Sequence, residues 1–118
     1  MIKPEHIDDI LIYNGVVDFR KSIDGLSSLV QNELNENPFS KTLFLFFSRN
    51  RRKVKILYWD QSGFALWYKR LEKNKFNRPK SKDLKSLVIN DNQLRMLLVG
   101  YDIWKMKPHE TLCYEQVC

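Results

Sequence analysis

Residues 42–71, TLFLFFSRNRRKVKILYWDQSGFALWYKRL, decide the fold of this chain. The opening run TLFLFFS is apolar at nearly every position, which predicts a central strand covered on both faces. A turn at 49–52 leads into KVKILYW, which alternates like a strand: Val54, Ile56 and Tyr58 point one way, and Lys53, Lys55, Leu57 and Trp59 point the other. A loop at 60–63 leads into FALWYKRL. The pattern predicts an antiparallel meander of three strands.

Before the meander, the sequence predicts one strand and one helix. Residues 9–13, DILIY, have the composition of a short strand, and a turn is expected at Asn14–Gly15. Asp18 is predicted to be the N-cap of a helix that begins at Phe19 and ends before Pro38. The apolar residues that define one face of this helix are Phe19, Ile23, Leu26, Val30 and Leu34.

After the meander, the polar and basic segment 72–83 predicts a loop, and 84–89, LKSLVI, predicts another strand. Asn90 and Gln93 have the spacing of a capping box that opens a second helix, and Gly100 suits its C-terminal cap. The fold class is therefore α+β, an antiparallel sheet of about four to five strands packed with two helices. We interpret 1–118 as a single domain with its core at about 9–104 and a mobile tail at 105–118.

Composition narrows the function classes. Hydrophobic residues make up 43% of the 118 residues and charged residues 29%, which is typical of a globular domain. The longest purely apolar run is five residues, 43–47, and the amino terminus is acidic where a signal peptide would be basic and then apolar. The two cysteines, Cys113 and Cys118, are too close together to staple the fold. A cytoplasmic protein with no contact to a membrane is the expectation.

The distribution of charge points to a polyanion. The net charge is +6, yet residues 49–85 alone carry 13 basic and three acidic residues. Such asymmetry within one small domain is typical of a surface that faces nucleic acid, although excess lysine can also simply keep a protein soluble. The predicted DNA-binding residues follow the meander and its extension: Arg49, Arg51, Arg52, Lys53, Lys55, Trp59, Lys69, Arg70, Lys73, Lys75 and Arg78.

In this hypothesis the cations track phosphates, and Trp59 is a stacking platform on the same strand face as Lys53 and Lys55. Neutralising about five phosphates predicts a slope of log K against log salt of about −4 to −5. The alternative interpretation buries Trp59 and Trp67 under a helix and leaves the lysines to shield the edge of the sheet.

Catalytic and metal chemistry find little support in the sequence. The carboxylates that a metal-dependent nuclease would need are explained as caps, turn residues and ion pairs: Asp18, Asp24, Asp60, Glu72 and Asp102. His109, Cys113 and Cys118 do not have the spacing of a zinc site. Neither a glycine-rich phosphate loop nor a nucleophile elbow is present. We therefore expect no enzyme activity, no cofactor and no metal.

Four stretches resemble a known family: VDFRKSIDGLSSLV at 17–30, NPFSKTLFLF at 37–46, VKILYWDQSGFALWYKRLEKNKF at 54–76 and LVINDNQLRMLLVGYD at 87–102. Together they resemble the small accessory proteins of insertion-sequence-66-type transposons, the TnpB or Orf2-like family. The chain departs from the family pattern at Lys41, where a glycine is common, and at Arg78, where a Trp usually precedes the proline. The second departure argues against a base-stacking role for that loop.

The resemblance implies a bacterial mobile-element protein that is encoded beside a separate transposase and is needed for efficient transposition, without a well-defined activity of its own. The expected partners are DNA, as transposon ends or as non-specific duplex, together with the transposase and other transposon-encoded proteins. In the alternative interpretation the chain is a module that docks on the transposase with little DNA binding. Its docking surface would then be the acidic first helix region with Asp18, Asp24, Glu33 and Glu36.

Overall fold

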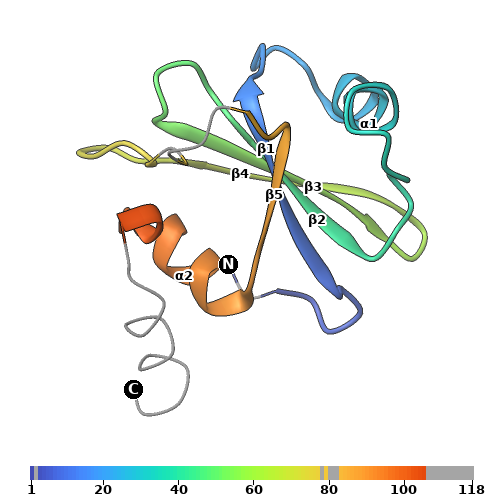
Figure 1. Ribbon diagram of the computed structural model, residues 1–118. Helices are drawn as coiled ribbons and strands as arrows, with labels where there is room; N and C mark the ends of the chain where they lie inside the picture. Colours follow the sequence, from blue (N-terminus) through green and yellow to red (C-terminus); the bar gives the residue numbers. More distant parts are fainter. Residues whose placement is uncertain (2, 78, 80–82, 106–118) are drawn as a thin grey trace.

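The computed structural model describes residues 1, 3–77, 79 and 83–105, and shows one five-stranded sheet with a helix on each face (Figure 1). The strand order is β4-β3-β2-β1-β5. β1 and β2 are parallel, and the other three neighbouring pairs are antiparallel. The predicted α+β class is confirmed. The elements are β1 (Asp9–Val16), α1 (Ile23–Asn32), β2 (Thr42–Phe47), β3 (Lys53–Asp60), β4 (Gly63–Arg70), β5 (Ser86–Ile89), α2 (Asp91–Leu98) and a 3-10 turn η1 (Ile103–Lys105).

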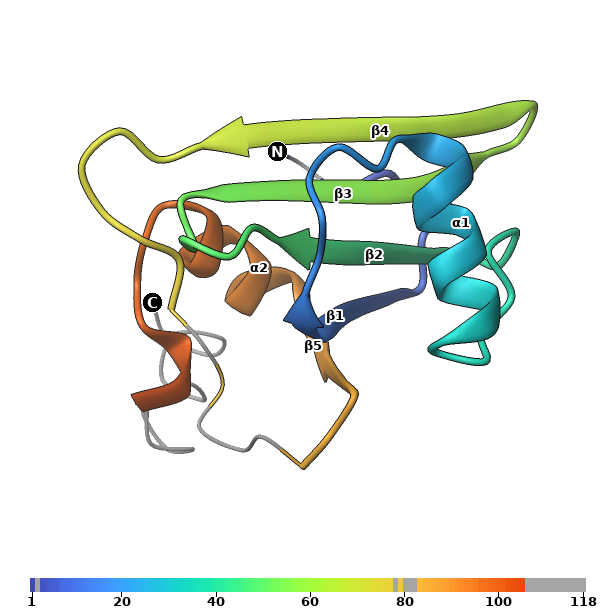
Figure 2. The same ribbon diagram turned by 90° about the horizontal axis from the view of Figure 1, so that it is seen from above.

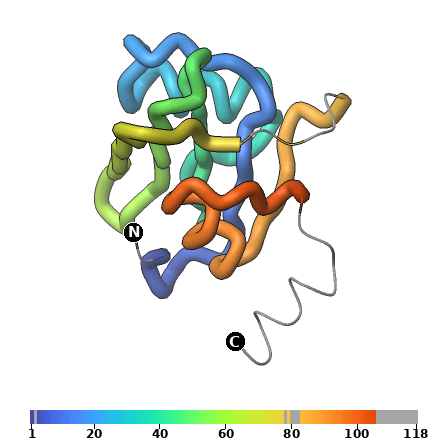
Figure 3. Tube along the Cα trace, turned by 90° about the vertical axis from the view of Figure 1, so that its left-hand side faces the viewer, coloured from blue at the N-terminus to red at the C-terminus, as the bar shows by residue number. Residues whose placement is uncertain are grey.

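β2 is the centre of the fold, as its apolar sequence predicts, and all six of its residues are buried. Its side chains alternate between two cores. Leu43, Leu45 and Phe47 pack on the face that α2 covers, and Phe44 and Phe46 pack on the face that α1 covers. The meander β2-β3-β4 follows in the predicted order, and both of its strand pairs are antiparallel. Figure 3 shows the N-terminal segment and α2 on the same side of the sheet, where Ile7 joins the α2-side core.

The turn predicted at Asn14–Gly15 is wrong, because β1 continues through both residues to Val16. The pairing of β1 with β2 shifts between Ile12 and Val16, so the strand accommodates this stretch as an irregularity and not as a reversal. A Cβ on Gly15 would lie 2.8 Å from ring atoms of Tyr13. Glycine here leaves room for the Tyr13 ring, which would have to shift if a Cβ were present, and it does not mark a turn.

The first helix begins four residues later than predicted. α1 starts at Ile23 with Ser22 at the N-cap position, whereas Phe19 lies outside the helix. Asp18 accepts a hydrogen bond of 3.0 Å from the backbone N–H of Arg20, so the aspartate closes a local turn and does not cap α1. Residues 17–22 therefore lie outside the helix and form a loop, which we call the β1–α1 loop.

The second helix matches the prediction closely. The Asn90 side chain accepts from the backbone N–H of Gln93, and the Gln93 side chain accepts from the N–H of Asn90, which completes the capping box. At the other end, Gly100 has a φ of 102° and its N–H donates to the carbonyl of Leu97. Because this backbone conformation strains residues with a Cβ, glycine is favoured at this position, where it ends the helix.

Candidate nucleic-acid interface

The basic residues gather at one end of the sheet. Because β1 and β2 run parallel, the segments that follow them, 17–22 and 48–52, leave the sheet at the same end. The pairing of Lys53 with Arg70 places the start of β3 and the end of β4 there too, and Figure 2 shows the arrowheads of β2 and β4 at this end. We call it the basic end; its described basic residues are Arg20, Lys21, Arg49, Arg51, Arg52, Lys53, Arg70, Lys73, Lys75 and Lys85.

The opposite end of the sheet is acidic. It contains the start of β1, the end of α1, the β3–β4 turn and the start of α2. The described acidic residues of this acidic end are Asp8, Asp9, Glu33, Glu36, Asp60 and Asp91. Two of them have a basic side chain nearby: Asp91 lies 3.4 Å from Nζ of Lys3, and Asp60 lies 3.7 Å from the His6 ring. The strands of the sheet therefore run between surfaces of opposite charge.

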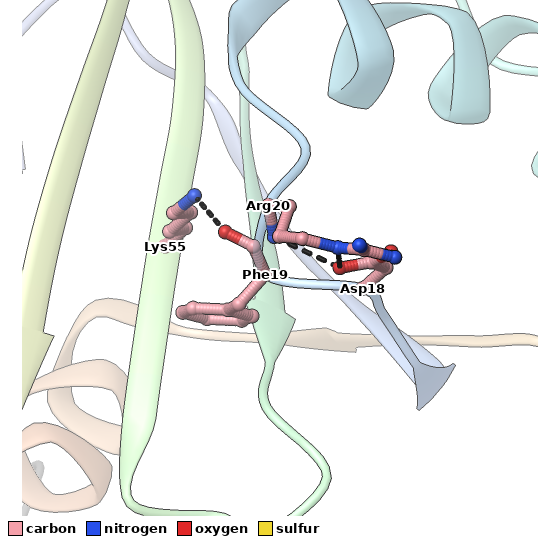
Figure 4. A network of polar contacts seen from close by, with 4 residues as sticks. All are labelled: Asp18, Phe19, Arg20 and Lys55. Carbon is pink, nitrogen blue, oxygen red and sulfur yellow. Dashed lines mark hydrogen bonds and ion pairs between the residues drawn. The ribbon is translucent and has the colours of Figure 1, made fainter.

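Lys55 holds the β1–α1 loop against the sheet (Figure 4). Its Nζ donates to the carbonyl oxygens of Phe19, at 2.8 Å, and Lys21, at 2.7 Å, and lies 4.9 Å from the centre of the Phe19 ring. Desolvation lowers the pKa of Lys55, and the nearby carboxylate of Asp18 partly opposes that shift. Lys55 is thus on the predicted strand face, but its ammonium is hydrogen-bonded to the β1–α1 loop and holds that loop in place.

The loop in turn presents Arg20. The guanidinium forms a bidentate pair with the Asp18 carboxylate, with Nε at 3.1 Å from both oxygens and an Nη atom at 2.7 Å from Oδ2. The hydrogen bonds from Arg20 hold the pKa of Asp18 at about 2. The Arg20 side chain is otherwise almost fully exposed. It therefore stands at the surface beside Asp18, close to the turn that carries Arg49.

A shallow hollow of about 670 Å³ separates the β1–α1 loop from the β2–β3 turn. Three cations and one carboxylate border it, and the carboxylate is that of Asp18, which Arg20 already engages. Arg49 and Lys53 have no acidic partner within 4.0 Å in the described part of the chain. The hollow is positive and open to anions, and its lining residues are Val16, Val17, Asp18, Phe19, Arg20, Ser48, Arg49, Asn50 and Lys53.

Arg51, by contrast, is a structural residue. It is only 8% exposed, and its guanidinium lies 4.5 Å from the centre of the Phe47 ring. Nε donates to the carbonyl of Phe76 and Nη2 donates to the carbonyl of Asn77, so the side chain ties the 71–77 segment to the β2–β3 turn. The backbone of Arg51 is left-handed, with a φ of 63°. Its guanidinium is thus directed into the protein and away from the hollow.

Lys69 and Arg70 occupy different faces of β4. Lys69 pairs with Val54 in register and lies on the α2 side, where Nζ donates to the carbonyl of Leu98 at 2.9 Å. Arg70 pairs with Lys53 on the α1 side and forms an exposed ion pair with Glu72 at 2.9 Å. Lys69 therefore caps α2 and lies away from Lys53, although both are among the predicted DNA-binding residues.

Trp59 lies at the other end of β3 from the basic turn. It lies six positions along the strand from Lys53, which corresponds to about 20 Å. Its ring packs against those of Phe39, at 5.0 Å, and Phe64, at 5.1 Å. Trp59 shares a strand face with Lys53, as predicted, but the structure does not bring the two side chains together at one site.

The remaining predicted residues that the structure describes are exposed cations. Arg49, Arg52, Lys73 and Lys75 are exposed, and within the described ranges none of them lies within 4.0 Å of a carboxylate. Arg78 lies outside the described residues, as do His109, Cys113 and Cys118. Among the described residues, no group of three or more His, Cys, Asp or Glu side chains could hold a metal ion. No described helix is long and apolar enough to cross a membrane.

Sequence reasoning missed Arg20, Lys21 and Tyr68 as members of this surface. Tyr68 is 49% exposed, pairs with Lys55 in register, and its ring lies 6.3 Å from that of Phe19. It is therefore an aromatic at the basic end, where Trp59 was expected. The signal that could have found Arg20 is the order strand, helix, strand over 9–47, because such a unit favours parallel strands, whose following loops lie at one edge of the sheet.

Comparison with known proteins gives a biological setting. The family model described as IS66 Orf2 like protein matches residues 8–108. Two proteins of Sinorhizobium fredii (strain NBRC 101917 / NGR234) are similar: uncharacterized protein y4jC, 33% identical over 107 residues and 91% of each chain, and uncharacterized protein y4hO, 34% identical over 102 residues and 86% of each chain. No solved structure matches the chain significantly. The match over 101 of its residues shows that this chain belongs to the IS66 Orf2-like family, whose members are accessory proteins of transposition.

Proposed function

We propose that this protein assists a separate transposase by binding DNA through its basic end. The observation that carries the proposal is the positive hollow between the β1–α1 loop and the β2–β3 turn, where Arg49 and Lys53 have no described acidic partner. Phosphate contacts supply most non-specific affinity for DNA, and flexible exposed arginines and lysines make them well. Arg52, Lys73 and Lys75 extend the positive surface beyond the hollow.

The proposed role is binding and not catalysis. Two carboxylates at the basic end, those of Asp18 and Glu72, are engaged by Arg20 and Arg70. Each of these carboxylates is therefore explained as a partner of an arginine. A cytoplasmic location belongs to the same proposal, because DNA and a transposase would both be met there.

A charge-reversal pair tests this function. Arg49→Glu together with Arg52→Glu reverses two exposed charges of the turn and leaves the buried Arg51 intact. The matched control, Lys41→Glu with Arg95→Glu, makes the same change in net charge away from the basic end, at two exposed positions. We expect the first variant to lose at least about tenfold in affinity for duplex DNA at constant salt, and the control to lose much less. Equal losses of DNA affinity in the two variants would mean that net charge alone causes the effect, and this result would overturn the proposal.

One observation favours a second candidate function, docking on the transposase. Phe39 is 56% exposed although it packs against both Trp59 and Phe64, at 5.0 and 5.2 Å between ring centres. Glu36 lies beside it along a hollow of about 420 Å³. An exposed aromatic with acidic neighbours is suited to a basic protein segment, because aromatic faces and carboxylates both attract arginine.

Pull-down with the purified transposase separates the two functions. The variant Phe39→Ala with Glu36→Gln should lose transposase association and keep DNA affinity if docking uses this surface. Arg49→Glu with Arg52→Glu should do the reverse. If the Phe39 variant binds the transposase as well as the wild type does, the acidic end is not the docking surface.

A further inference from the structure

Tyr68 is an exposed aromatic residue at the basic end. It is 49% exposed, whereas the other residues of 63–69 are half-buried. Two other aromatic residues of the described chain have comparable exposure: Phe39 packs against Trp59 at the acidic end, and Tyr101 follows α2 on the other side of the sheet. Tyr68 is therefore the exposed aromatic that shares a sheet face with the cations of β3.

The register of β3 with β4 places Tyr68 among positive side chains. Tyr68 pairs directly with Lys55, and Lys53 is its diagonal neighbour on the same face. Arg70 lies two positions further along β4 on that face, where it pairs with Glu72 at 2.9 Å. Lys53 has no acidic partner within 4.0 Å in the described part of the chain, so it is the cation beside Tyr68 that is open to a phosphate.

Phe19 connects Tyr68 with the positive hollow. The Phe19 ring lies 6.3 Å from the ring of Tyr68, at an angle of 57°, and Nζ of Lys55 lies 4.9 Å from its centre (Figure 4). Phe19 also lines the hollow, together with Arg20 and Arg49. A nucleotide whose phosphate is bound in the hollow has its base within reach of Tyr68, because one side chain separates the two.

An exposed ring beside phosphate-binding cations is the arrangement with which proteins bind unpaired nucleotides. The cations follow the backbone, and bases stack on the aromatic side chains with little dependence on sequence. A base within a duplex is already stacked between its neighbours, so it has to leave the helix before it can stack on a side chain. Tyr68 is therefore suited to unpaired DNA and adds little to the binding of a duplex.

We propose that Tyr68 stacks on a base of unpaired DNA while the cations of the basic end hold the adjoining phosphates, so that the protein prefers DNA with separated strands over duplex. The inference rests on the proposed function, because it takes the positive hollow as the phosphate site. Within the described residues the ring packed against Tyr68 is that of Phe19, and the exposed part of the Tyr68 ring is left for a base.

Two DNA ligands with equal numbers of phosphates test the preference. One is a duplex of about 26 base pairs, and the other is a fork of about 20 base pairs with about six unpaired thymidines on each strand at one end. Charge alone predicts weaker binding to the fork, because single strands release fewer counterions per phosphate. Stacking predicts the reverse, and we expect the fork to bind roughly tenfold more tightly at constant salt. Equal affinities, or tighter binding of the duplex, would overturn the proposal.

Substitutions at Tyr68 assign the preference to its ring. Tyr68→Leu removes the ring and keeps much of its apolar bulk, so this variant should bind the fork no more tightly than the duplex. Tyr68→Phe keeps the ring and should keep the preference. Tyr101→Leu is the matched control, because it makes the same change at a tyrosine that is 59% exposed on the α2 side. A Tyr68→Leu variant that still prefers the fork would contradict the role of Tyr68.

Photocrosslinking gives a second readout that needs no substitution. Iodouracil replaces thymine in the unpaired strands of the fork, and irradiation joins it to an aromatic ring that stacks on it. Mass spectrometry of the digested protein should find the crosslink on the β4 peptide that contains Tyr68. Crosslinks confined to other peptides would overturn the proposal.

The same ligands keep this inference distinct from the proposed function. Arg49→Glu with Arg52→Glu should weaken the binding of fork and duplex by the same factor, because it removes phosphate contacts and leaves Tyr68 in place. If the wild type binds the duplex but shows no preference for the fork, the stacking role fails and the proposed function stands. If the wild type binds neither ligand at moderate salt, the proposed function fails as well.

Discussion

The ammonium of Lys55 bonds the carbonyl of Phe19 at 2.8 Å and lies over the ring of the same residue at 4.9 Å. This contact joins two stretches that are 36 residues apart, the loop after β1 and the strand after the basic turn. It fixes the loop so that Arg20 borders the same hollow as Arg49. The candidate interface is therefore assembled by a lysine that does not itself face the ligand.

Replacing Lys55 with Met should loosen the loop. The change removes two hydrogen bonds from a charged donor, and because the site is partly exposed we expect a loss of about 1 kcal/mol in the free energy of unfolding. DNA affinity should also fall, since Arg20 is no longer held beside Arg49. Urea denaturation and DNA titration measure the two effects. Lys53→Met is the control: it removes one charge from the same strand face and should leave stability unchanged.

Arg51 should matter for stability through both its side chain and its backbone. Arg51→Ala loses the bonds to Phe76 and Asn77 and the contact with Phe47, at a cost of about 2–3 kcal/mol. Arg51→Gly loses the same contacts but relieves the positive φ of 63°, so it should be about 1 kcal/mol more stable than the alanine variant. Thermal unfolding of the two variants tests this. Equal stabilities would contradict a strained backbone at this position.

The Asp18–Arg20 pair gives a pH signature. Because the folded-state pKa of Asp18 is depressed to about 2, the stabilisation from this carboxylate is present above its unfolded value near 3.8. It is lost as pH falls from that value through about 2. An NMR titration of the Asp18 carboxyl should show a midpoint near 2 in the wild type. In Arg20→Gln the midpoint should return toward the ordinary value, and an unchanged midpoint would rule out Arg20 as the cause.

Removing the Asp18 charge should strengthen DNA binding. Asp18→Asn eliminates the only carboxylate that borders the hollow within the described residues, and it frees the Arg20 guanidinium for phosphate. We expect affinity to rise about threefold and the salt slope to steepen by up to about 0.9, the value of one added phosphate contact. Anisotropy titrations at several salt concentrations measure both. Weaker binding by this variant would mean that Arg20 requires Asp18 for its orientation.

Substitutions at Lys69 and Lys73 should have different effects, one on stability and the other on DNA binding. Lys69→Met removes the donor to Leu98 at the end of α2 and should cost about 1 kcal/mol of stability with little change in DNA affinity. Lys73→Met should leave stability unchanged and flatten the salt slope by about 0.9. The opposite assignment of effects would show that Lys69, and not Lys73, faces the DNA.

Local sequence signals predicted the elements whose causes are local. The alternation in 53–59 fixes which side chains share a face, and the Asn90–Gln93 spacing fixes the start of α2. The N-cap at Asp18 was mispredicted because the aspartate satisfies the N–H of Arg20 instead, and both arrangements fit the same residue type.

The site was harder to predict because it depends on long-range pairing. Alternation within 9–16 does not reveal that β1 lies parallel to β2, and this pairing brings Arg20 to Arg49. Residue type alone also cannot distinguish the buried Arg51 from the exposed Arg49 and Arg52, which are its close neighbours. The charge bias marks the segment 49–85, and the fold determines which of its cations are exposed.

The most direct test of the account is fluorescence anisotropy of the purified protein with a DNA duplex of about 20 base pairs, titrated over a salt series. One duplex carries the terminal inverted repeat of the transposon and the other a scrambled sequence. We predict binding to both, with a slope of log K against log salt of about −4 to −5. Absence of binding at moderate salt, or a slope near zero, would contradict a phosphate-binding basic end.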